Sequence, residues 1–298
     1  MTNAIQEVFE QAGCTGSLCV RSLDDDAEVV LGADELVTPA STFKVMIALE
    51  AETWFAEGRL DPCEPVRLAA ADRTPGFVGV SLFADDAVVS WRDLVVLMLT
   101  ISDNPATDAL LGRVGVDAVN ATAARLGLTD TLVVSDLRTM LDSVGEDLGR
   151  RDWATGAAWA ATASPEELAR ADELLLNSRA LDPKRGTRTT PRDMAELLRL
   201  IWTDQAGPAE ACARVRTVLS QQLTKHRIAS GFRLPARVAA KSGGLFGVIR
   251  NEVGVVSYPD GRRYAAAVFT RSPLLADDAA INRAIGTATA LAVAELSR

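Results

Sequence analysis

The pattern of hydrophobic and polar positions predicts strands at both ends of the chain and helices between them. Alternating or continuous apolar positions predict strands over residues 14–23, 27–33, 237–244, 248–261 and 262–271, the last two joined by a turn at 259–261. Apolar residues at helical spacing predict helices over 2–12, 41–58, 91–100, 104–115, 116–127, 164–177, 190–202, 208–223 and 278–296. The pattern of residues 128–163 predicts no regular element.

This order of elements predicts an α+β fold, a three-layer α/β/α sandwich. Strands from both chain ends would form one antiparallel sheet, flanked by the terminal helices, with an all-helical lobe packed against it. We expect one domain over residues 1–298, with one lobe made of 1–40 and 236–298 and a helical lobe of 41–235. A cleft between two such lobes is the expected place for a site.

Composition and charge exclude some classes of protein. The chain has 298 residues, 48% of them hydrophobic, and a net charge of −9, so no basic stripe is available to bind nucleic acid. The longest apolar stretches, such as 288–296, are too short to span a bilayer. The first residues lack the features of a secretory signal, which predicts a cytoplasmic protein as written, or a secreted or periplasmic one if a signal was removed.

The cysteine and histidine content argues against a metal enzyme. The four cysteines (14, 19, 63 and 212) form no CxxC pair, and we expect small buried side chains in a reducing cytoplasm. His226 is the single histidine, whereas most histidine-based zinc sites need more than one, and no GxSxG motif accompanies it. We expect His226 at the surface, and no metal or other cofactor.

Three short motifs could carry chemistry. Ser41 and Lys44 lie one turn apart on the same face of a helix start, where the lysine could activate the serine hydroxyl. Residues 102–104 read Ser-Asp-Asn, and residues 241–244 read Lys-Ser-Gly-Gly at the end of a strand. Taken singly, the three motifs could equally be a capped helix, a turn and a bulge.

Taken together and in this order, S-x-x-K, S-D-N and K-[ST]-G resemble the signature of class A β-lactamases and penicillin-binding proteins. The resemblance extends over nearly the whole chain, and the text around the motifs looks most like actinobacterial serine hydrolases related to class A enzymes. The chain has only four lysines, at positions 44, 184, 225 and 241, and two of them stand in the motifs. Unlike arginine, a lysine can serve as a base.

The resemblance implies catalytic roles for three residues in the first two motifs. Ser41 would attack the acyl carbonyl, with Lys44 as the base for acylation. Ser102 would relay the proton to the leaving group.

It also implies binding roles for residues of the second and third motifs. Asn104 would orient Lys44 and hold the substrate amide, while Lys241, helped by Ser242, would tune Ser102 and attract a substrate carboxylate. The two glycines Gly243 and Gly244 would let the substrate approach the strand edge. The backbone N–H groups of Ser41 and Gly244 would form the oxyanion hole.

Three features depart from the class A pattern. Glu173 stands near the position of the glutamate that activates the deacylating water, but its surroundings read as a continuous amphipathic helix. The stretch between the second and third motifs is longer than expected, with the extra material within 132–175. Arg250 is a candidate for binding the substrate carboxylate, but it stands one position out of register, which would turn it to the other face of the sheet.

The sequence therefore predicts an acyl-serine hydrolase whose partner is a small acyl compound. A β-lactamase, an esterase or amidase, and an acyltransferase of small-molecule biosynthesis remain open within that class. The main alternative is a penicillin-binding protein that is acylated without turnover. The helical surroundings of Glu173 predict that the acyl ester is hydrolysed slowly. The oligomeric state stays open.

Overall fold

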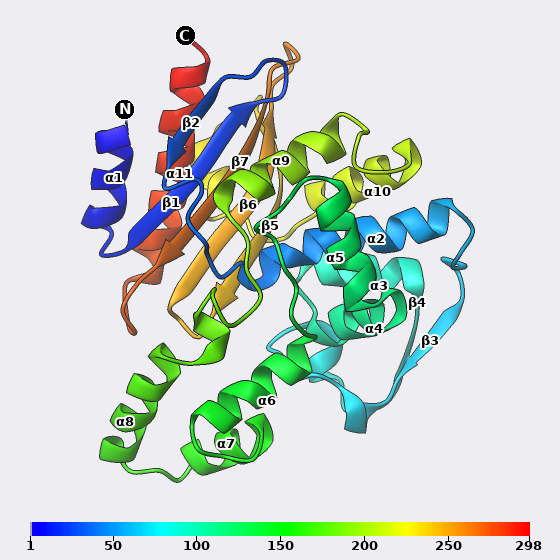
Figure 1. The fold of residues 1–298 in the computed structure, drawn as a ribbon, viewed down its shortest axis with the longest axis vertical. Helices are drawn as coiled ribbons and strands as arrows, with labels where there is room; N and C mark the ends of the chain where they lie inside the picture. The colour runs from blue at the N-terminus through cyan, green and yellow to red at the C-terminus, as the bar shows by residue number, and fades with distance from the viewer. Residues whose placement is uncertain (1) are drawn as a thin grey trace.

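The fold is α+β, built around one antiparallel sheet to which both ends of the chain contribute (Figure 1). The computed structural model describes residues 2–298. Within them, the strand order of the large sheet is β2-β1-β7-β6-β5. Its strands are β1 (Thr15–Ser22), β2 (Glu28–Leu31), β5 (Arg237–Leu245), β6 (Ile249–Ser257) and β7 (Arg263–Arg271).

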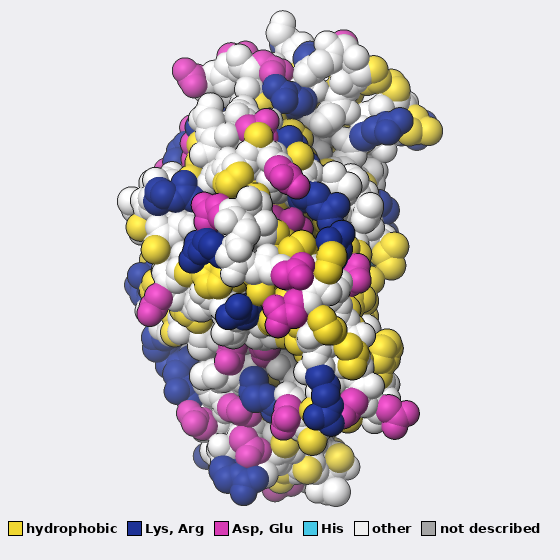
Figure 2. All heavy atoms as spheres, turned by 90° about the vertical axis from the view of Figure 1, so that its right-hand side faces the viewer, with side chains coloured by type: hydrophobic (Ala, Val, Ile, Leu, Met, Phe, Trp, Pro, Cys, Tyr) yellow, Lys and Arg dark blue, Asp and Glu magenta, His cyan; other side chains and the backbone are white. Residues whose placement is uncertain are grey.

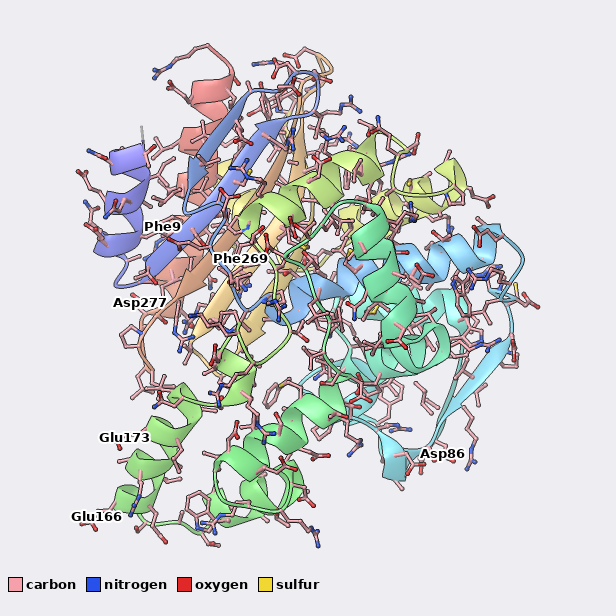
Figure 3. All side chains as sticks on the ribbon, in the orientation of Figure 1. Phe9, Asp86, Glu166, Glu173, Phe269 and Asp277 are labelled. Atoms are coloured by element: carbon pink, nitrogen blue, oxygen red, sulfur yellow. The ribbon has the colours of Figure 1, made fainter. Side chains whose placement is uncertain are left out.

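The two faces of the sheet contact different layers, because side chains alternate along each strand. On β7, Ala266 and Val268 pack with the terminal helices α1 (Thr2–Gln11) and α11 (Asp278–Leu296). Ala265, Ala267 and Phe269 face the other way, into the core shared with the helical lobe. Phe9 on α1 and Phe269 on β7 mark the two layers in Figure 3. The predicted three-layer arrangement is confirmed.

The helical lobe is organised around a helix that is buried along most of its length. This helix is α2 (Lys44–Ala56), whose residues from Lys44 to Glu52 are all buried. Four helices pack against it: α3 (Trp91–Thr100), α4 (Asn104–Val114), α5 (Val116–Arg125) and α10 (Ala209–Ser220). The lobe also contains α9 (Pro191–Trp202), which packs on the sheet and on α10, and α6 (Leu137–Asp147), α7 (Trp153–Ala160) and α8 (Pro165–Leu176), which pack mainly on one another.

Local sequence signals explain where several of these helices begin. The Ser90 hydroxyl accepts a hydrogen bond from Asp93 N–H at the start of α3, and Thr190 caps α9 in the same way before Pro191. Ser164 and Glu167 form the predicted capping box of α8. The helix predicted to open at Ser41 differs, because a 3₁₀ turn (η1, Ala40–Phe43) precedes the α-helix.

Some elements went unpredicted. β3 (Pro65–Leu68) and β4 (Ala87–Ser90) form a separate two-stranded sheet, and each is too short to give a periodic signal. Helices α6 and α7 occupy the stretch in which no element was predicted. Only Gly156 of α7 is buried, so this helix lacks the apolar stripe by which amphipathic helices are recognised.

The surface agrees with the composition. Figure 2 shows basic and acidic side chains interspersed on the face it draws, without a continuous basic stripe. Among the described residues, no helix has the length and apolar character that a membrane span requires. His226 is exposed as predicted, but the prediction of buried cysteines is wrong for Cys63, which is exposed, while the other three are buried.

Candidate active site

The turn that carries Ser41 is held in place from the neighbouring sheet. Asn251, fully buried on β6, donates hydrogen bonds from Nδ2 to the carbonyl oxygens of Thr38 (2.9 Å) and Pro39 (3.1 Å). The Thr42 hydroxyl donates to the same Pro39 oxygen at 2.9 Å. These bonds fix the backbone on both sides of Ser41, which places the serine at the sheet edge that carries the third motif.

Gly243 allows β5 to approach the nucleophile turn closely. A Cβ atom at this position would lie 2.8 Å from the Pro39 carbonyl oxygen and 3.0 Å from the backbone nitrogen of Ser41. Any side chain would therefore push the strand away from Ser41. The close approach brings the backbone of Ser41 and the end of β5 together, as an oxyanion hole between Ser41 and Gly244 requires.

Lys44 is completely buried and links the first two motifs. Its Nζ donates hydrogen bonds to the Ser102 carbonyl oxygen (2.8 Å), the Ser102 hydroxyl (3.3 Å) and Asn104 Oδ1 (3.0 Å). Burial lowers the pKa of the Lys44 ammonium from 10.5 to about 7, although the nearby carboxylates of Asp108 and Asp103 oppose the change. The amine is therefore substantially neutral near pH 7 and can accept a proton.

Ser102 adopts a left-handed backbone conformation (φ +65°), which is unusual for a residue other than glycine. The next residue stabilises this turn. The buried Asp103 carboxylate accepts hydrogen bonds from Ala106 N–H at the start of α4 and from Val80 N–H in the facing loop. Gly79 leaves room for it, because a Cβ there would overlap the Asp103 carboxylate. The strained turn presents Ser102 to Lys44.

Lys241 is also completely buried and lies near the other motif lysine. Its Nζ donates a hydrogen bond of 2.7 Å to the Ser242 carbonyl oxygen. Burial is the largest cause that lowers the pKa of Lys241 well below its usual value, followed by the charges of Lys44 and Arg227, while Glu252 opposes the shift. Burying two lysines whose charges repel one another lowers the stability of the fold, and such perturbed pairs are typical of functional sites.

A buried polar network behind β5 was missed by the sequence analysis. Glu252 accepts hydrogen bonds from Ile228 N–H (2.6 Å) and from Gln222 Nε2 (3.1 Å), and Gln222 Oε1 accepts one from Ser242 N–H (2.5 Å). Arg227 donates from Nη1 to the carbonyl oxygens of Gly243 and Asn251, both at 2.7 Å. The signal for this network in the sequence was Glu252 itself, a charged residue within an apolar run that predicts a buried strand.

The side chains of two predicted site residues form no hydrogen bond with the residues of the three motifs. The strand register pairs Arg250 with Gly244, and its guanidinium forms an ion pair with Asp278 of α11 and a hydrogen bond with Ser272. Arg250 is thus turned to the α11 face of the sheet, as the register argument predicted, and its role in binding a substrate carboxylate stays a prediction. Glu173 is exposed on α8 (Figure 3). Because α8 is a regular helix with its own capping box, Glu173 is a surface carboxylate here, and its role as deacylating base stays a prediction.

The structure thus brings the three motifs together at one edge of the sheet. Lys44 donates hydrogen bonds to Ser102 and Asn104, and its charge lowers the pKa of Lys241. Gly243 lies close to the backbone of Ser41. The two other lysines of the chain, at positions 184 and 225, are exposed. A serine, a buried amine with a lowered pKa, a second hydroxyl and a second lysine are groups that can serve acyl transfer through a serine ester.

One known protein family matches nearly the whole chain. A family model described as "Beta-lactamase enzyme family" matches residues 1–296, so the chain belongs to the Beta-lactamase2 family. A curated relative is the β-lactamase regulatory protein BlaB of Streptomyces cacaoi. It is 29% identical over 285 residues, which cover 92% of this chain and 89% of BlaB.

Solved structures of the same fold include enzymes and penicillin-binding proteins. A β-lactamase from Sphaerobacter thermophilus superposes with a TM-score of 0.74 at 25% identity, covering 97% of this chain and 93% of that one. A variant of PBP-A, solved as an acyl-enzyme complex with penicillin G, gives a TM-score of 0.76 at 21% identity and covers 99% and 96%. An ancestral class A β-lactamase gives 0.78 at 18% identity, covering 99% of both chains. The fold is therefore that of class A β-lactamases and PBP-A.

Proposed function

We propose that this protein is a serine acyl hydrolase of the penicillin-recognising type, which forms a covalent acyl ester on Ser41. The observation that carries the proposal is the environment of Lys44. The buried amine has a pKa of about 7 and is held between Ser102 and Asn104, one helical turn from Ser41. This arrangement supports a lysine that acts as a general base at neutral pH.

The proposed acylation step uses the first two motifs. Neutral Lys44 accepts the proton of the Ser41 hydroxyl while the serine oxygen bonds to the substrate carbonyl carbon. The carbonyl oxygen takes up the electron pair and accepts hydrogen bonds from backbone N–H groups of Ser41 and Gly244. When the carbonyl reforms, the bond to the leaving nitrogen or oxygen breaks, and that atom receives the lysine proton through the Ser102 hydroxyl. Each oxyanion donor would contribute about 3 kcal/mol to lowering the barrier.

The proposed binding of an anionic substrate uses the third motif. Lys241 is buried beside Arg227, whose guanidinium lies 3.9 Å from the position that a Cβ of Gly244 would occupy. A substrate carboxylate at this end of β5 would favour the protonated form of Lys241 and accept a hydrogen bond from Ser242. Acyl compounds with a carboxylate, β-lactams among them, are the substrate class that we propose.

We further propose that the acyl ester is hydrolysed slowly. Glu173 is exposed on α8, and the two carboxylates near Lys44 already have structural partners. Asp103 accepts from Val80 and Ala106 N–H groups, and Asp108 accepts from Thr74 and from the start of α6. Without general-base assistance, which typically contributes about 10²–10⁴-fold, the ester would last for minutes or longer.

Slow hydrolysis favours a second candidate function, that of an acylated receptor rather than an enzyme with turnover. The Streptomyces cacaoi relative is named a regulatory protein, which is compatible with such a role. Mixing the protein with a chromogenic cephalosporin separates the two functions. Release of one equivalent of product, with a persistent adduct in intact mass spectrometry, would support the receptor. Rapid multiple turnover would support a β-lactamase and would contradict slow deacylation.

A further inference from the structure

The extra residues between the second and third motifs form a helical extension made of α6, α7, α8 and the following 3₁₀ turn, η4 (Arg179–Leu181). One contact holds the extension together and another joins it to the sheet. Arg179 of η4 donates to the Asp147 carboxylate of α6 at 2.9 Å, and Arg271 of β7 donates to the Leu181 carbonyl oxygen at 2.8 Å. The extension is therefore tied to the sheet (Figure 1).

One aromatic pair connects the extension to the strand of the third motif. Trp153, the first residue of α7, stacks on Phe246 with ring centroids 5.9 Å apart and an interplanar angle of 29°. Phe246 occupies the turn between β5 and β6 in a left-handed conformation (φ +50°). A left-handed backbone conformation costs free energy for a bulky residue, and the stacking contact with Trp153 offsets part of that cost.

The Trp153–Phe246 pair lies beyond the end of β5, where we expect the acyl part of a substrate to extend. Lys241 and Ser242 stand at the carboxylate end of the proposed site, and Gly244 stands at the oxyanion hole. A substrate group on the far side of the carbonyl would therefore extend along β5 towards Phe246. The nucleophile turn is adjacent, because Ala40 packs in the same apolar cluster as Leu245 and Phe246.

We propose that Trp153 and Phe246 close the acyl end of the cleft and thereby select substrates with compact acyl groups. The inference rests on the proposed function and names its substrate class. Both rings are only partly buried, so a substrate can reach them. A long acyl chain would have to displace the stacked pair of rings, which favour contact with one another. A short acyl group would fit without disturbing it.

The test compares two aromatic truncations on the same helix. Trp153→Ala opens the end of the cleft, whereas Trp159→Ala removes a ring that stacks with the Arg150 guanidinium instead. For each protein, the rate constant for the first equivalent of p-nitrophenolate is measured with p-nitrophenyl acetate and with p-nitrophenyl octanoate. In Trp153→Ala, we expect the octanoate-to-acetate ratio to rise about tenfold or more, with no change in Trp159→Ala.

Phe246→Gly provides a second route if Trp153→Ala fails to fold. Glycine relieves the left-handed strain at this turn while it removes the partner ring, so this variant should fold and should raise the same ratio. An unchanged ratio in whichever of the two variants folds, with wild type acylated normally, would overturn the inference alone. If wild type releases p-nitrophenolate from neither ester and no adduct forms on Ser41, the proposed function fails and the inference with it.

Discussion

The rate of acylation should depend on pH through the neutral fraction of Lys44. Burial lowers the pKa of this lysine to about 7, so the amine loses its proton as pH rises through neutrality. An ordinary lysine with a pKa near 10.4 is neutral in only about one molecule in a thousand at pH 7.5. The buried amine is mostly neutral at that pH, which increases the active fraction by several hundredfold. The rate should therefore rise between about pH 6 and 8 and then level off.

A change at Asp108 tests the sign of this argument. The Asp108 carboxylate raises the pKa of Lys44 by stabilising the ammonium. Asp108→Asn removes the charge, so the acid limb of the profile should move to lower pH by some tenths of a unit to about one unit. The asparagine oxygen can still accept one of the bonds that Asp108 now receives from Thr74 Oγ1 and the N–H groups of Leu137 and Arg138.

The assay is stopped-flow acylation by a fluorescent penicillin or an activated ester from pH 5 to 10. Lys241 is a second buried lysine whose titration could produce the same limb. Lys241→Arg keeps the positive charge and removes that titration, so it serves as the control. Lys44 is supported as the base if the acid limb of the pH–rate profile stays near pH 7 in Lys241→Arg and moves to lower pH in Asp108→Asn. A limb near pH 10, or one that Asp108→Asn moves upward, would refute the reasoning.

Three further predictions follow from individual contacts. Asn104→Ala removes an acceptor 3.0 Å from Lys44 Nζ and should slow acylation about tenfold to a hundredfold, measured by the same labelling kinetics. Lys44→Met should abolish labelling, yet it should raise Tm by a few °C at pH 6, where the wild-type protein buries the Lys44 charge. Because the pKa of Lys44 is lowered to about 7 in the folded state, the wild-type protein gains stability as pH rises from about 7 towards 10. The difference in Tm between the two proteins should therefore narrow over that range. Glu173→Gln should leave the lifetime of the penicillin adduct unchanged in a mass-spectrometric time course, whereas a marked lengthening would restore its role in deacylation.

Much of the fold could be predicted because its signals are local. The capping box at Ser164, the cap at Thr190 before Pro191 and the last helix, Asp278–Leu296, all occur as the pattern indicated. These signals depend on neighbours in the sequence, so a single chain reveals them. That Lys44 meets Ser102 and Asn104 was predicted by the resemblance to the class A family, which the three motifs carry in their order.

What could not be predicted depends on contacts between distant segments. Asn251 contacts Thr38 and Pro39 across more than 200 positions, and nothing in its own neighbourhood indicates that it supports the nucleophile turn. Gln222 likewise reaches Ser242 only because the chain folds back onto β5. The ring of Trp153 lies in a stretch without apolar periodicity, so its partner Phe246 became visible only in the structure.

The most direct test of the central claim is the location of the acyl group. Wild-type protein and Ser41→Ala would each be mixed with penicillin G and analysed by intact mass and peptide mapping. We predict one persistent adduct on the peptide that contains Ser41 in wild type, and none in Ser41→Ala with an unchanged circular dichroism spectrum. An adduct on another residue, or equal labelling of Ser41→Ala, would contradict the account.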